Sequence, residues 1–177
     1  MRLLNKQLSL KPQDLLVLLK MACHRDQVFT YAQLAQELGI AASEAHSCLR
    51  RAILARLATP SDGNGIVVVR SALREFVVYG AKYSFPASMG SSTRGMPTGY
   101  AAAPLRELIL QPDDLPPVWP YAEGATRGLA LYPLYPTAPM AAAKDARLYE
   151  CLALFDALRS GAARERETAQ QLLTERL

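Results

Sequence analysis

This 177-residue chain has few of the side chains on which many enzymes and metal proteins depend. It has two histidines and one tryptophan, and its three cysteines (Cys23, Cys48 and Cys151) are too few and too scattered for a disulfide framework. Buried free thiols are the default interpretation for these cysteines, with a redox switch at Cys23 or Cys151 as the alternative.

Long apolar runs are also missing. No run reaches the roughly 18 residues of a membrane-spanning helix. The N-terminal sequence MRLLNKQLSLKPQD lacks both the apolar stretch and the cleavage site of a signal peptide. We therefore expect a cytoplasmic protein that does not bind a membrane.

The motifs of common enzyme classes are absent. The sequence has no Gly-x-Ser-x-Gly elbow, no Gly-x-Gly-x-x-Gly fingerprint and no His-Glu-x-x-His zinc motif. Gly90 and Gly95 have the spacing of a phosphate-binding loop, but Met and Pro follow where that motif needs Lys and Ser or Thr. His46 and Cys48 are two residues apart and point to different helix faces, which disfavours a zinc site. We expect no catalytic site, no metal and no cofactor.

The net charge of +4 is distributed unevenly. The first 80 residues contain ten Lys or Arg against six Asp or Glu, and residues 81–106 contain three bases and no acid. From residue 107 onward, seven bases meet ten acids. This asymmetry favours contact of the first hundred residues with a polyanion.

The first sixty residues have the periodicity of three helices. Pro12 suits the first turn of the first helix, where its missing N–H group is not needed. Thr30 and Gln33 form a capping box for a second helix, and Gly39 ends it in the left-handed conformation. Ser43 is the predicted cap of the third helix. Its predicted buried face comprises Ala45, Cys48, Leu49, Ala52, Ile53 and Leu57.

A β-hairpin is predicted directly after the third helix. The five residues 61–65, SDGNG, are strong turn formers, and the flanking sequences LATP and IVVVR favour two short strands. Ile66–Val69 is a β-branched run that fits a strand better than a helix. Ser71 then begins a fourth predicted helix.

This order of helices and hairpin resembles the winged helix-turn-helix domains of bacterial transcriptional regulators, loosely those of the MarR family. The residues that carry the resemblance are Leu34, Ala35, Gly39, Ile40, Ala45 and Cys48. It implies a mainly α fold with a small β-hairpin wing, and a DNA-binding domain over residues 1–83. After residue 84 a Pro-rich segment replaces the long dimerisation helices of that family.

In such a domain the third helix enters the major groove of double-stranded DNA. Arg50 is then the candidate for bidentate binding to guanine, while serines suit phosphates or base edges. The predicted DNA contacts are Thr30, Tyr31, Ser43, Glu44, His46, Ser47, Arg50, Arg51 and Arg70. The alternative is a winged helix that binds protein, with these residues as an ordinary solvated face.

The second predicted domain, residues 84–177, begins with a change in composition. Ten of the twelve prolines lie between Pro86 and Pro139, which excludes long helices there, yet many apolar residues remain. We expect an ordered, loop-rich unit whose main helical piece is 105–110. Its acid-free start suggests an anion or DNA-backbone contact formed by Lys82, Ser91, Ser92, Thr93 and Arg94. A surface loop joining two subdomains is the alternative.

Two helices are predicted at the end of the chain. Asp145 can begin the first, whose apolar stripe from Leu148 to Leu158 either completes the core of one subunit or packs against a second copy. The C-terminal part resembles predicted regulators that accompany toxin–antitoxin or phage-defence systems. The overall expectation is a homodimeric, sequence-specific repressor that acts by occupying a promoter. The second hypothesis is an antitoxin-like module that binds a partner protein.

Overall fold

The computed structural model describes residues 9–63 and 65–177. The N-terminal sequence interpreted above as lacking a signal peptide lies largely outside these residues. The described chain is mainly helical, with a two-stranded hairpin and a small three-stranded sheet. Its helices are α1 (Pro12–Cys23), α2 (Tyr31–Leu38), α3 (Ala42–Leu54), α4 (Arg70–Glu75), η1 (Phe76–Ala81), α5 (Lys82–Ser84), η2 (Gly99–Ala101), α6 (Leu105–Leu108), α7 (Ala138–Ala143), α8 (Ala146–Ser160) and α9 (Ala163–Arg176). Its strands are β1 (Ala58–Pro60), β2 (Ile66–Val68), β3 (Met89–Pro97), β4 (Pro117–Pro120) and β5 (Thr126–Leu131).

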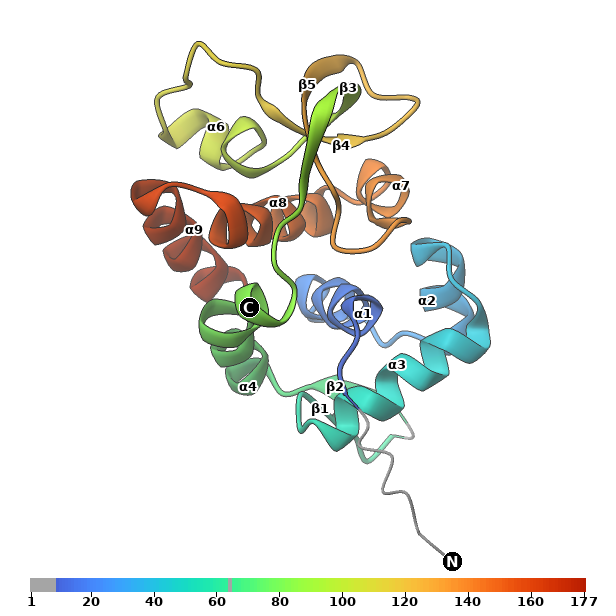
Figure 1. Cartoon of the computed structure of the whole chain (residues 1–177). Helices are drawn as coiled ribbons and strands as arrows, with labels where there is room; N and C mark the ends of the chain where they lie inside the picture. The colour runs from blue at the N-terminus through green and yellow to red at the C-terminus, as the bar shows by residue number, and fades with distance from the viewer. Residues whose placement is uncertain (1–8, 64) are drawn as a thin grey trace, which may run out of the picture.

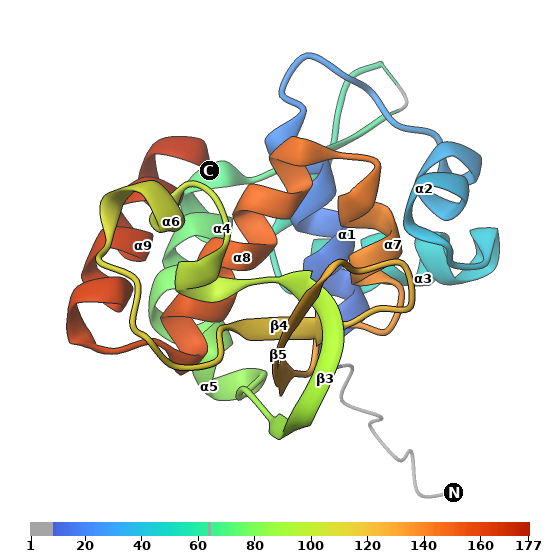
Figure 2. The same ribbon diagram turned by 90° about the horizontal axis from the view of Figure 1, so that it is seen from above.

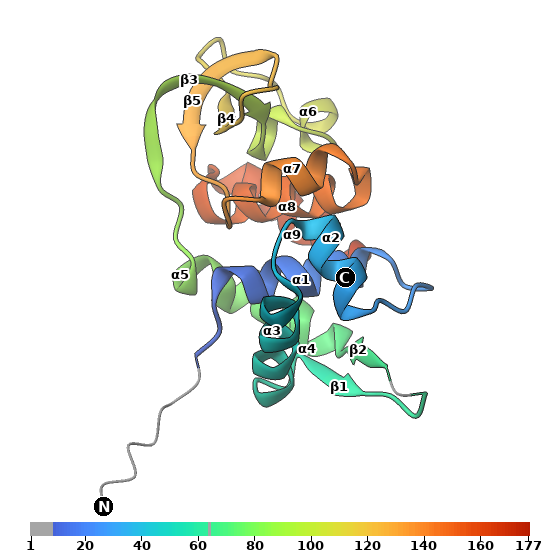
Figure 3. The ribbon, with the colours of Figure 1, turned by 90° about the vertical axis from the view of Figure 1, so that its right-hand side faces the viewer.

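The elements are arranged in layers. The strands β3, β4 and β5 lie at one end, and α3 with the β1–β2 hairpin lies at the other (Figures 1 and 3). Between these ends, α8 and α1 cross the middle of the molecule. Seen from above, the three strands lie over α8, with α6 and α9 on one side and α2 and α3 on the other (Figure 2).

Local sequence signals place the first three helices. The Thr30 hydroxyl accepts a hydrogen bond from the Gln33 backbone N–H at 3.2 Å, and the Gln33 side chain accepts one from the Thr30 N–H at 2.8 Å. The predicted capping box is therefore confirmed. Gly39 follows with φ of 65°, the predicted left-handed end of α2. The predicted start of α3 was wrong, because the cap residue is Ala41 and Ser43 lies one residue inside the helix.

The predicted hairpin is present. Strand β1 pairs with β2 in an antiparallel register that places Ala58 opposite Val68 and Pro60 opposite Ile66. The third predicted helix is shorter than the sequence suggested, since α3 ends at Leu54 and Leu57 is buried beyond it. The fourth helical stretch starts at Arg70 and continues through α4, η1 and α5 to Ser84.

The segment expected to be loop-rich contains a sheet that the sequence did not predict. Strand β3 pairs antiparallel with both β4 and β5, and β4 pairs parallel with β5, so each strand contacts the other two. Such tight closure requires close backbone approach. A Cβ atom on Gly95 would lie 1.9 Å from the Trp119 carbonyl oxygen, and one on Gly128 would lie 2.1 Å from that of Pro116. The predicted helical piece is confirmed as α6.

Helix α8 is the central helix of the molecule. The Asp145 side chain accepts a hydrogen bond from the Leu148 N–H at 3.1 Å, so the predicted helix start is confirmed. Leu148 and all residues from 151 to 158 are buried, because α1, α7 and α9 surround this helix. The apolar stripe therefore completes the core of one subunit and is not available to a second copy.

One hydrophobic core crosses the boundary predicted after residue 83. It includes Leu16 and Leu19 of α1 together with Leu154 and Phe155 of α8. A buried ion pair also joins the halves, since the Lys20 ammonium lies 2.6 Å from the Asp145 carboxylate. Among the described helices, none has the length and apolar character needed to cross a bilayer.

Candidate functional site

The outward side of α3 forms a shallow groove with the start of α2 and the hairpin. We call it the α3 groove. It has a volume of about 270 Å³. Its lining residues are Tyr31, His46, Arg50, Ile53, Leu54 and Ile66. Three of the nine predicted DNA contacts therefore come together at one place.

Helical spacing explains this convergence. His46, Arg50 and Leu54 are four residues apart along α3 and so lie on one face of the helix. Tyr31 is the first residue of α2, and its ring meets that of His46 edge-on, with centroids 5.1 Å apart and planes at 65°. Ile66 begins β2 and closes the groove from the hairpin. The Gly39 turn and the capping box thus determine the shape of the groove.

Arg50 is the cation of the α3 groove. Its side chain is exposed and has no hydrogen-bond or ion-pair partner within residues 9–63 and 65–177. Arg56 is also exposed, just after the end of α3, where the backbone adopts a φ of 60°. A guanidinium without an internal partner presents five donors in a planar fork, which matches a carboxylate, a phosphate or a guanine edge.

The predicted DNA-contact residues that carry a hydroxyl group lie at the surface. Ser43 is exposed, and Ser47 is half-buried with its hydroxyl donating to the Ser43 carbonyl at 2.9 Å. The side chain of Thr30 is exposed and occupied in the capping box. These groups flank the α3 groove without lining it.

Arg51 does not point outward as the sequence suggested, and Glu44, whose side chain is 33% exposed, is paired with it. The Arg51 Nε donates to Asp14 Oδ2 at 2.7 Å, and its Nη2 donates to Asp14 Oδ1 at 2.6 Å and to Glu44 Oε1 at 2.7 Å. Asp14 is completely buried and the Arg51 side chain is only 10% exposed. The charge of Arg51 therefore holds α3 against α1, and its DNA contact stays a prediction.

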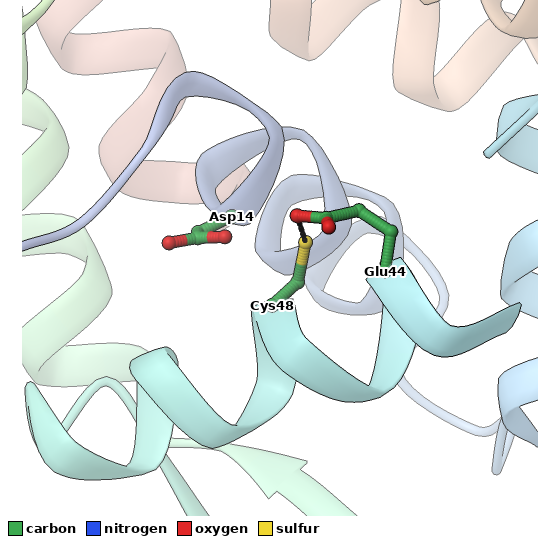
Figure 4. A group of neighbouring side chains, drawn as sticks. All are labelled: Asp14, Glu44 and Cys48. Atoms are coloured by element: carbon green, nitrogen blue, oxygen red, sulfur yellow. Dashed lines mark hydrogen bonds between the residues drawn. The ribbon is translucent and has the colours of Figure 1, made fainter. Parts of the chain in front are cut away.

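The same cluster is the one place among the described residues where carboxylate and thiol groups gather as metal ligands would. Asp14, Glu44 and Cys48 lie together where α1 crosses α3, with Cys48 Sγ 3.7 Å from Glu44 Oε1 (Figure 4). Arg51 already supplies the positive charge, with its Nη2 3.5 Å from Cys48 Sγ. A divalent ion would have to displace this guanidinium. The cluster is therefore better explained as an ion pair than as a metal site.

Burial and the neighbouring charges shift the pKa values of the side chains in this cluster. The hydrogen bond from Arg51 lowers the pKa of Glu44, although burial opposes the effect. Burial and then the neighbouring Asp14 raise the pKa of the Cys48 thiol. The hydrogen bond to Asp14 raises the pKa of Arg51 above its ordinary value. Cys48 is thus a buried thiol whose ionisation is opposed, in agreement with its predicted place in the core.

Arg70 is also used inside the protein. Its Nη2 donates to the carbonyl oxygen of Ala22 at 3.0 Å and to that of Arg176 at 2.9 Å. It therefore satisfies carbonyl groups at the ends of α1 and α9, a favourable place for a cation. Burial lowers the pKa of this guanidinium from its ordinary value. Arg70 is half-buried and makes these internal hydrogen bonds, and its DNA contact from the end of the hairpin stays a prediction.

The predicted anion-binding loop is not a loop. Ser91, Ser92, Thr93 and Arg94 lie in β3, and Lys82 begins α5 with its ammonium 5.1 Å from the Tyr83 ring centroid. Strand β3 lies at the opposite end of the molecule from α3, whereas α5 contacts α8 in the middle of the molecule (Figures 1 and 3). The four residues in β3 therefore do not adjoin α3, and their contact with an anion or DNA backbone stays a prediction. Arg94 instead lies opposite Arg127 of β5, and Arg127 Nε donates to Ser92 Oγ at 3.3 Å.

No family model matches this chain, and no curated protein and no solved structure is similar to it. The α3 groove must therefore be interpreted from its own chemistry. It combines one unpaired guanidinium, an imidazole, a phenol and three aliphatic side chains. Such a surface suits a ligand that offers both hydrogen-bond acceptors and apolar faces.

Sequence reasoning missed the apolar half of this groove. Ile53 was predicted for the buried face of the third helix, Ile66 was predicted for a strand, and Leu54 was given no role. Leu54 follows Arg50 by four residues, and this spacing is the signal that placed it on the same face. Ile66 has no such local signal, because only the pairing of β1 with β2 brings it to α3.

Proposed function

We propose that this chain is a DNA-binding transcriptional regulator and that residues 9–83 form a winged helix-turn-helix domain. Three helices followed by an antiparallel hairpin support the proposal, as does the left-handed Gly39 turn between α2 and α3. In this proposal α3 is the recognition helix and the β1–β2 hairpin is the wing.

The observation that carries the proposal is the unpaired Arg50 on the exposed face of α3, beside His46 and Tyr31. The major groove of B-DNA is about 12 Å wide and accommodates an α-helix. With α3 in that groove, Arg50 binds a guanine edge and His46 binds a neighbouring base. Ser43 and Ser47, one turn earlier, contact phosphates or base edges. The small number of cations predicts modest non-specific affinity and specificity that depends on few residues.

The proposed mode of action is repression by promoter occupancy in the cytoplasm. Occupancy needs no chemistry beyond binding, and a homodimer would place two recognition helices on successive turns of a two-fold site. Because the stripe of α8 is buried within one subunit, the proposed dimer uses another surface.

Fluorescence anisotropy with the intergenic DNA upstream of the protein's own gene tests this proposal. Loss of a bidentate guanine contact costs ~1–3 kcal/mol, so we expect Arg50→Ala to weaken binding by roughly 5- to 150-fold. Arg164→Ala, at an exposed position of α9 far from the groove, is the matched control and should bind like the wild type. Unchanged affinity of Arg50→Ala for a site that the wild type binds would refute the assignment of α3.

Salt gives a second readout. Affinity for DNA should fall steeply with added salt, and each phosphate contact contributes about −0.9 to the slope of log K against log salt. Arg56→Ala should reduce this slope by about one unit if Arg56 binds a phosphate. A salt-independent affinity would contradict the proposed polyanion partner.

A second candidate function is supported by exposed apolar side chains in the groove and on the neighbouring hairpin. Leu54 is 58% exposed and Val67 is 43% exposed, on α3 and on the hairpin. These side chains favour an antitoxin-like or other module that binds a partner protein. Leu54→Ser should then abolish co-purification with a neighbouring gene product while Arg50→Ala preserves it. Retention of DNA by the purified protein, lost in Arg50→Ala, would favour the regulator instead.

A further inference from the structure

Two of the three cysteines meet inside the molecule, although 128 residues separate them. Cys23 is the last residue of α1, and Cys151 lies in the second turn of α8. The Cys23 thiol donates to Cys151 Sγ at a sulfur–sulfur distance of 2.8 Å, and both are free thiols. Because a disulfide bond is ~2.05 Å long, the sulfurs need to move by less than ~1 Å to bond.

A cavity of about 300 Å³ opens onto this pair. Its other lining residues are Arg147, Glu150 and Arg176. Arg147 and Cys151 are four residues apart on α8, so the guanidinium lies on the thiol's face of the helix. Arg176 donates to Glu150 at 3.0 Å, so these two lining residues neutralise each other's charge. Arg147 then gives the cavity a net positive charge. Both thiols therefore line a cavity that carries positive charge, Cys23 half-buried and Cys151 1% exposed.

We propose that Cys23 and Cys151 form a reactive dithiol that reduces a hydroperoxide and becomes a reversible disulfide. In the first step the Cys151 thiolate attacks one peroxide oxygen, the O–O bond breaks, and Cys151 becomes a sulfenic acid. The leaving alkoxide takes a proton and departs as an alcohol, or as water when the oxidant is hydrogen peroxide.

In the second step Cys23 attacks the sulfenic sulfur. The S–O bond breaks, and the leaving hydroxide takes the Cys23 proton to form water while the S–S bond forms. Overall, two thiols lose two electrons and the peroxide gains them. The hydrogen bond to Cys151, with burial, raises the pKa of the Cys23 thiol, so Cys23 keeps its proton until this step.

The surroundings favour dithiol chemistry over metal binding. His24 follows Cys23, but its Nε2 is held 2.7 Å from the Asp145 carboxylate. Within residues 9–63 and 65–177, the only group of three potential metal ligands is the Asp14 cluster, which does not include this pair. Cys48 belongs to that cluster and is buried, so it serves as an internal reference thiol.

Peroxide titration of the reduced full-length protein, followed by tryptic mass mapping, tests the proposal. One equivalent of hydrogen peroxide should remove two of the three thiols and lower the mass by ~2 Da, reversibly with dithiothreitol. Cys23 lies in tryptic peptide 21–25, Cys151 in 148–159 and Cys48 in 26–50. A cross-link between 21–25 and 148–159 is the expected product. A cross-link that contains 26–50, or sulfinic acid without a cross-link, would overturn the proposal.

Variants separate the two steps. Cys23→Ser should trap the sulfenic acid on peptide 148–159, detected as a dimedone adduct, and should form no disulfide. Cys48→Ala is the matched control and should form the disulfide at the wild-type rate. Dimedone labelling of 26–50 in Cys23→Ser, with 148–159 unlabelled, would refute the assignment of Cys151 as the attacking thiol. The wild-type mass map does not depend on how well either variant folds.

Discussion

Arg50 and Arg51 are adjacent in the sequence, but their replacement by alanine should change the stability of the protein by very different amounts. Arg50 is exposed and unpaired within the described residues, whereas Arg51 makes two hydrogen bonds to Asp14 and one to Glu44. We predict that Arg51→Ala reduces the free energy of unfolding severely. Arg50→Ala should leave that free energy within ~0.5 kcal/mol of the wild-type value, as surface substitutions usually do.

The magnitude follows from burial. Asp14 is completely buried and the Arg51 side chain is 10% exposed, so water cannot replace the lost guanidinium. Removing one partner of such a pair costs ~3–5 kcal/mol, because the remaining charge stays buried without compensation. For a chain of this size, 1 kcal/mol lowers the melting temperature by ~2–4 °C, so we expect a loss of ~6–20 °C.

Urea denaturation followed by the fluorescence of the single tryptophan provides the measurement, since Trp119 is 1% exposed and lies in the core. The double variant Asp14→Asn with Arg51→Met should lose less stability than the two single variants together, because it removes both charges. The reasoning would be refuted if Arg51→Ala unfolded within ~0.5 kcal/mol of Arg50→Ala.

Three further predictions concern other parts of the molecule. Burial raises the pKa of Tyr149 to about 12, while tyrosine in the unfolded chain ionises near ~10. The unfolded state therefore releases this proton first, and stability should fall more between pH 10 and pH 12 in the wild type than in Tyr149→Phe. Gly95→Ala should cost more than ~4 kcal/mol in urea denaturation, since its Cβ would lie 1.9 Å from a backbone oxygen. Gly63→Ala, with open space around it, should be nearly neutral. Oxidation of Cys23 and Cys151 to a disulfide should raise the free energy of unfolding by up to ~5 kcal/mol through loop closure, measured with and without dithiothreitol; no gain in a protein whose cross-link is verified would contradict this.

Much of the first half of the chain was predictable because its signals are local. The capping box of Thr30 and Gln33, the left-handed Gly39 and the turn-rich sequence between β1 and β2 each involve residues within a few positions of one another. The cap of α8 at Asp145 is local in the same way. Helical spacing likewise gathered the predicted residues His46 and Arg50 on one face of α3.

The sheet of β3, β4 and β5 was not predictable for the opposite reason. Its strands pair across distant positions, such as Met96 with Trp119 and Arg94 with Arg127. The prolines were interpreted only as excluding long helices, yet several lie at strand ends, where a missing N–H group is tolerated: Pro97 ends β3, and Pro117 and Pro120 bound β4.

The buried carboxylate of Asp156 is another feature that the sequence did not predict. Asp156 is completely buried in α8 and accepts hydrogen bonds from Trp119 Nε1 and Thr98 Oγ1, each at 2.6 Å, and from Arg159 Nε at 2.7 Å. Burial raises the pKa of this carboxyl, and the Arg159 charge opposes the rise. In the sequence, Asp156 interrupts an apolar stripe without any sign of the partners that allow it to be buried.

The sequence by itself therefore determined where α2 begins and ends and where α8 begins, because capping and left-handed turns depend on neighbours along the chain. Only the tertiary structure decided which charged residues remain available for binding. The packing of α1 on α3 encloses Arg51 beside Asp14 and leaves Arg50 exposed, although periodicity placed both on the outside. Burial of a charge depends on the partner that another element supplies, and one stretch of sequence does not contain that partner.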